Sequence, residues 1–125
     1  MNIQFISSEL RELCNSKVNL ENRFDIKTAN LLGRRLTQLA AAESLNEFSP
    51  EGSAPMKCSC DRNYSNLFKV PVGRDLNLTF TCDLTLASND PNDWEKITSI
   101  KIEKIGSAIQ TIHTIQVYFW KKSLR

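Results

Sequence analysis

The spacing of apolar residues in this chain changes once, and that change limits the folds open to it. Residues 49–55 contain two prolines and one glycine in seven positions, a composition typical of a loop. Before this loop apolar residues recur every three or four positions, and after it they alternate with polar ones. A first half that is mainly helical, followed by a second half made of β-strands, predicts an α+β domain.

The first half predicts one strand and two helices. Ile3 to Ile6 is short and apolar, and Ser7 is a plausible hydroxyl cap for a short helix that follows it. A longer helix is expected to begin at Asp25 and to end near Leu45. Its apolar side is formed by Ala29, Leu32, Leu36, Leu39 and Ala40.

The second half predicts four strands, over residues 56–60, 67–70, 76–82 and 97–105. Because the first three are joined by short links, we expect an antiparallel meander. The predicted order is therefore β-α-α-β-β-β-β, with two N-terminal helices packed on an antiparallel sheet.

The segment 106–125 has no clear period. Its many β-branched and aromatic residues favour a strand, while the spacing of Ala108, Ile112, Ile115 and Phe119 also fits a helix. We interpret residues 1–105 as the domain and 106–125 as a C-terminal extension, a strand or a docked tail. Its apolar content predicts burial against the sheet or a partner chain.

Length and composition are consistent with one ordinary globular domain of 125 residues. The chain has no apolar run of the roughly 20 residues that span a bilayer, and its N-terminus does not resemble a signal peptide, so we expect a cytoplasmic protein without a membrane partner. Four scattered cysteines are expected to stay reduced. Cys58 and Cys60, with a single distant His113, do not make a zinc site, so no metal is expected.

Basic residues gather in the middle of the chain, although the net charge is only +2. Lys57, Arg62, Lys69 and Arg74 fall within eighteen residues of each other. Such a set is either a solvated sheet face or a surface that contacts nucleic-acid phosphates.

Three phrases of the sequence resemble the RelE/ParE toxin superfamily, and in particular its HigB-type branch. Residues 36–48 are similar to the second helix of that family, and Asp61-Arg62 followed by residues 67–70 resembles its "GDR" hairpin. The most specific phrase, residues 93–105, resembles the last strand of the family.

The resemblance implies a toxin of a type II toxin-antitoxin system that cleaves mRNA on the ribosome. Its partners would be the ribosome with its mRNA and a cognate HigA-like antitoxin with a helix-turn-helix. Such an endoribonuclease needs no metal and no small-molecule cofactor. It would activate a ribose 2′-hydroxyl and stabilise the charge on the phosphorane with Arg and Lys.

Carried onto this sequence, the resemblance assigns catalysis to Lys57, Arg62 and Arg74. Lys57 occupies the strand position where the branch carries a basic residue or His, and Arg62 matches the arginine of "GDR". Asn77 stands where a phosphate-binding arginine is expected, and Arg74, three residues earlier, is the candidate to replace it. The closing Asp-Tyr-His of the family is replaced by Gly106, Ser107 and Ala108.

The RNA-binding residues are expected to be Lys69, Asn77 and Tyr64, the last either stacking on a base or covering the edge of the core. Two alternatives stay open. One is a catalytically silent module of the same fold that binds an antitoxin or nucleic acid, and the other is a ParE-like toxin directed at gyrase.

Overall fold

The computed structural model describes residues 1–50, 52–60, 67–82 and 91–107, which form an α+β fold. The helices are α1 (Ser8–Cys14), α2 (Lys17–Arg23) and α3 (Ile26–Ala41), with 3₁₀ turns η1 (Leu45–Phe48) and η2 (Pro91–Lys96). The strands are β1 (Asn2–Phe5), β2 (Ser59–Cys60), β3 (Leu67–Val72), β4 (Leu76–Cys82) and β5 (Ser99–Ser107). None of the helices in these ranges is both long and apolar enough to cross a membrane.

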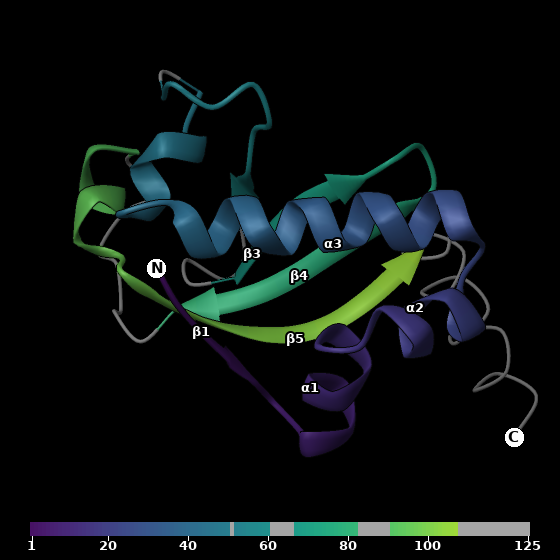
Figure 1. Ribbon diagram of the computed structural model, residues 1–125. Coiled ribbons are helices and arrows are strands. Elements are labelled where there is room, and N and C mark those ends of the chain that lie inside the picture. The colour runs from purple at the N-terminus through teal and green to yellow at the C-terminus, as the bar shows by residue number, and fades with distance from the viewer. Residues whose placement is uncertain (51, 61–66, 83–90, 108–125) are drawn as a thin grey trace, which may run out of the picture.

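The five strands form one mixed sheet in the order β1-β5-β4-β3-β2 (Figure 1). The pairs β2–β3, β3–β4 and β4–β5 are antiparallel, as predicted. The prediction of a wholly antiparallel sheet is wrong, because β1 lies parallel to β5, with Ile3 opposite Ile100 and Phe5 opposite Ile102. No tight turn joins these two strands, so the chain between them is free to return in either direction.

The N-terminal half contains three helices where two were predicted. The first predicted helix ends at Cys14, and Ser16 starts a new helix by accepting a hydrogen bond from the Asn19 amide at 3.2 Å. A serine side chain at the N-cap accepts a hydrogen bond from an amide that has no partner within the helix. Ser16 therefore favours the end of one helix and the start of the next.

The long helix α3 begins as predicted and ends four residues earlier than predicted. The Asp25 carboxylate accepts from the Thr28 amide at 2.7 Å and from the Thr28 hydroxyl at 3.1 Å, and these bonds lower the pKa of Asp25. At the other end, the Met1 ammonium group donates to the Ala40 carbonyl at 2.8 Å. A cation is favourable at this end because the helix dipole is negative there.

The predicted strand over residues 56–60 is reduced to Ser59–Cys60. The Cys58 amide donates to the Phe48 carbonyl at 2.8 Å, so the backbone before Ser59 follows η1 and not β3. The last strand occupies Ser99–Ser107, slightly later than predicted, and the C-terminal extension beyond 107 lies outside the described residues.

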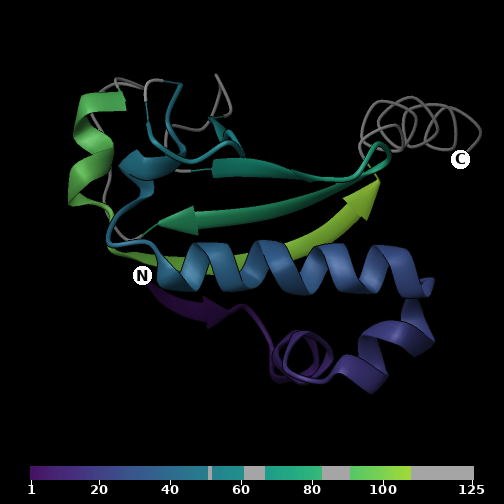
Figure 2. The same cartoon turned by 45° about the horizontal axis from the view of Figure 1, so that its top comes forward.

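Helix α3 runs alongside the sheet (Figure 2), and the core lies between this helix and one face of the sheet. α3 contributes Leu32 and Leu39, both fully buried, and the sheet contributes alternate residues of each central strand. These sheet residues are Phe68, Val70, Leu78, Phe80, Ile100 and Ile102. Phe68 stacks on Phe80 with ring centroids 5.8 Å apart. The residues that alternate with these core residues along the strands face away from α3.

The Cys14 thiol is buried where α1 ends. Burial raises the pKa of this thiol to about 11, because the charged thiolate loses its hydration. At neutral pH the thiolate, which is the reactive form, is therefore scarce.

We expect Leu32→Ala to lower the free energy of unfolding by about 2–5 kcal/mol, since it removes a fully buried side chain from the α3–sheet interface. Ile26→Ala on the same helix is the matched control, because Ile26 is 66% exposed. It should change stability by less than about 0.5 kcal/mol. Urea unfolding followed by circular dichroism measures both; equal losses would contradict this packing.

Cys14 should react slowly with iodoacetamide at pH 8 in the folded protein, about a hundredfold more slowly than in the urea-unfolded chain. Mass spectrometry of the peptide that carries Cys14 resolves it from the other thiols. Alkylation at the same rate in both states would show that the thiol is not buried.

Candidate nucleic-acid interface

The face of the sheet that points away from α3 carries polar and basic side chains, and we call it the outer sheet face. Its polar members are Ser59 of β2, Lys69 of β3, Asn77, Thr79 and Thr81 of β4, and Lys101, Glu103 and Lys104 of β5. Leu67 and Pro71 of β3 lie on the same face, opposite Thr81 and Asn77. On β2 to β4, and on β5 as far as Glu103, these residues alternate along their strands with core residues, which explains their shared orientation.

Cross-strand pairing arranges these residues in rows. Lys69 lies opposite Thr79, and Thr79 lies opposite Lys104. The two lysines therefore stand on either side of a threonine, with their backbones roughly 10 Å apart, twice the spacing of adjacent strands. Lys101, paired with Thr81, lies in the next row.

A β-bulge places Lys104 on this face. In a regular strand Lys104 would point to the same side as Ile102, which is buried in the core. The register between β4 and β5 shifts between Thr79 and Phe80, so that Phe80 pairs with Ile102 while Thr79 pairs with Lys104. An extra residue of this kind re-aims the side chains that follow it. Ile105 then returns to the core side opposite Leu78.

The charge of the outer sheet face is positive. Three lysines share it with one carboxylate, Glu103, which accepts a hydrogen bond from the Thr81 hydroxyl at 3.0 Å. Thr79 is 3% exposed, so its hydroxyl is not available to a ligand and the lysines on either side of it are the groups that a ligand would meet. Ammonium groups beside hydroxyl and amide donors are the groups that proteins use to hold phosphate oxygens.

The structure describes two of the three expected catalytic residues, Lys57 and Arg74, and they belong to different loops. The Lys57 ammonium donates to the Gly52 carbonyl at 2.9 Å, five residues back in its own loop. Arg74 is exposed in the β3–β4 turn, next to Gly73, whose φ of 73° favours glycine. That turn begins after Val72, roughly 10 Å along the strand from Lys69. Arg62 lies outside the described residues.

Two of the three expected RNA-binding residues lie on one surface of the structure. Lys69 and Asn77 both lie on the outer sheet face, in adjacent rows. Tyr64 lies outside the described residues. Lys101 and Lys104 lie on the same face, although they were not predicted from the sequence. A signal for them was present, because the isoleucine spacing on β5 changes from two to three between Ile102 and Ile105.

The cysteine pair shows no sign of a metal site. Within the described ranges, no three Cys, His, Asp or Glu side chains gather in a way that would hold a metal ion. Burial, with a smaller effect of neighbouring Cys60, raises the pKa of Cys58 far above its usual range, so this thiol stays protonated. His113 lies outside the described residues.

No family model matches this chain in a scan of known protein families, and comparisons with curated proteins and with solved structures find no match either. The properties of the interface therefore rest on its own residues.

Proposed function

We propose that this chain is a RelE-like, HigB-type toxin that acts on mRNA at the ribosome and is neutralised by a cognate antitoxin in the cytoplasm. The observation that carries the proposal is the row Lys69–Thr79–Lys104 on the outer sheet face. Cations from two strands, on either side of the buried Thr79, suit a sequence-independent grip on an RNA backbone.

The arrangement of the elements is compatible with this proposal. An N-terminal strand and helices precede an antiparallel β3–β4–β5 meander, and helix α3 fills one face of the sheet. The opposite face carries the lysines and the other polar residues of the outer sheet face, together with Leu67 and Pro71 of β3. In this reading the phosphates lie along β3 to β5, and Lys101 adds a third cation in the next row, opposite Thr81.

A catalytically silent RNA-binding module is the second candidate, and the placement of two cations favours it. Lys57 is engaged by a backbone carbonyl, and Arg74 lies in a turn away from Lys69. Cleavage needs a group that moves a proton and cations that stabilise the phosphorane at the same point. Binding needs only the basic face.

Induced expression of the chain in a bacterial host tests the proposal. We expect growth arrest, with primer extension showing breaks within translated codons. Lys69→Glu with Lys104→Glu should relieve the arrest, because the double variant turns an attractive row into a repulsive one. Lys27→Glu with Arg34→Glu makes the same change in charge at exposed positions of α3 and should leave the arrest intact.

The other outcomes are distinct. Arrest with intact mRNA and damaged DNA would point to gyrase, and no arrest would leave the silent module. If there is no arrest, RNA binding by the purified protein tests the silent module. The double variant Lys69→Glu with Lys104→Glu loses two phosphate contacts, so the slope of log Kd against log salt should fall by about 1.4, since each contact to a single strand contributes about 0.7. An unchanged slope would remove Lys69 and Lys104 from the interface.

A further inference from the structure

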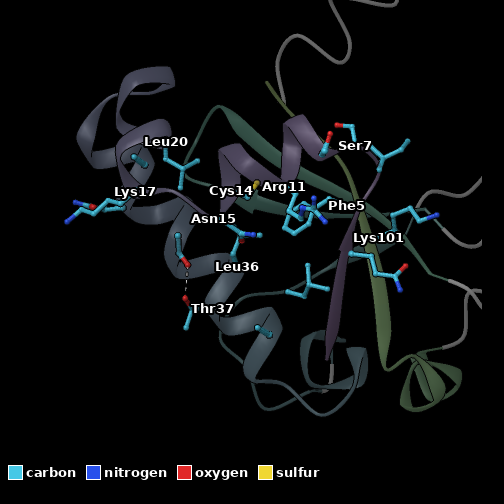
Figure 3. A pocket seen from close by; sticks show the side chains of 18 residues that line it. Phe5, Ser7, Arg11, Cys14, Asn15, Lys17, Leu20, Leu36, Thr37 and Lys101 are labelled. Carbon is cyan, nitrogen blue, oxygen red and sulfur yellow. Dashed lines mark hydrogen bonds between the residues drawn. The ribbon is translucent and has the colours of Figure 1, made fainter.

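A groove of about 1160 Å³ runs along the free edge of β1, between that strand and helices α1 and α3 (Figure 3). Five consecutive residues from Ile3 to Ser7 line it. Side chains from both faces of the sheet border it, with Phe5 on the core side and Gln4 and Lys101 on the outer side. The groove therefore follows the edge of the strand and not one face of it.

The backbone of β1 presents unused hydrogen-bonding groups to this groove. The Ile6 amide donates to the Ile102 carbonyl at 3.0 Å and the Asn2 amide to the Thr98 carbonyl at 2.9 Å. Because alternate residues of a strand point to opposite sides, the amides and carbonyls of Ile3 and Phe5 face away from β5. Among the described strands β1 pairs only with β5, so this edge is open.

The far wall of the groove has open space beside Gly33 of α3. A Cβ added to Gly33 of α3 would meet no atom within 4 Å. Ala40, another small residue, and Leu36 line the same wall. On the strand side, Ile6 is 55% exposed, so the edge offers an apolar contact as well as hydrogen bonds.

The charge of the groove selects the kind of partner. Arg11, Lys17 and Lys101 line it, and no Asp or Glu is among its lining residues. Lys17 forms an ion pair with Glu21 at 3.9 Å, so we assign recognition of a charged partner to the other two cations, Arg11 and Lys101.

We propose that this groove binds an extended acidic segment of a partner polypeptide, which adds a strand to β1. Main-chain hydrogen bonds to Ile3 and Phe5 would give affinity, and Arg11 and Lys101 would select carboxylate side chains. A second copy of this chain fits less well, because residues 2–6 carry no acid and pairing would bring the basic flanks of both copies together. The groove shares Lys101 with the outer sheet face but does not use Lys69 or Lys104, so Arg11 and Lys69 are the positions that test the two proposals separately.

Fluorescence anisotropy with a labelled eight-residue peptide of alternating glutamate and valine tests this site on the full chain. We expect binding that weakens at least about tenfold with Arg11→Glu, and a lysine–valine peptide should not bind. Gly33→Leu should also weaken binding at least about tenfold by filling the groove. Leucine is a better helix former than glycine, so this variant should melt no lower than the parent chain.

Lys69→Glu is the matched control, since it reverses a charge on the outer sheet face and should leave peptide affinity unchanged. Equal affinity for the acidic and basic peptides would overturn the proposal. So would a dimer in analytical ultracentrifugation that Gly33→Leu dissociates, because the occupant would then be a second copy. Displacement of the acidic peptide by an oligouridine that Arg11→Glu no longer binds would assign the groove to RNA instead.

Discussion

The parallel pairing of β1 with β5 is the contact on which the rest of this structure depends. It joins residues nearly a hundred positions apart, with Asn2 opposite Ser99 and Phe5 opposite Ile102. Ile3 and Phe5 are thereby directed to the core side, where they pack against the buried cluster under α3. The same pairing leaves β1 at the edge of the sheet, so the element that closes the core also borders the groove of about 1160 Å³.

Helix α3 and the bulge on β5 together give the sheet two unlike faces. Leu32 and Leu39 fill one face, and the bulge turns Lys104 to the other while keeping Ile105 on the core side. A lysine on the core side would lose its hydration without a partner, which is costly. The irregularity thus resolves a conflict between the sequence and a regular strand, and in doing so it builds the basic row on the outer sheet face.

Local patterns were sufficient to predict much of this architecture. The alternation on β4 and the N-cap at Asp25 were both identified correctly, because each depends on neighbours in sequence. The division at Ser16 was missed, although serine there is a cap signal. The direction of β1 could not be predicted, since it depends on a partner strand about a hundred residues away.

The candidate site was predicted only in part, for a related reason. Their closeness in the sequence suggested that Lys57, Lys69 and Arg74 act together. In the structure the Lys57 ammonium donates to the Gly52 carbonyl in its own loop, and Arg74 lies in the β3–β4 turn beyond the strand that carries Lys69. Lys104 stands 35 residues from Lys69 in the chain and two strands from it in the sheet. That these two lysines lie near each other follows only from the order of the strands in the sheet.

Backbone amide exchange of the free chain, followed residue by residue by NMR, tests the central pairing most directly. The Ile6 amide donates to β5 and should be protected, while the amides of Ile3 and Phe5 should exchange rapidly because they face the open edge. Equal protection of all three amides would contradict an open β1 edge, and rapid exchange at Ile6 would contradict its pairing with β5.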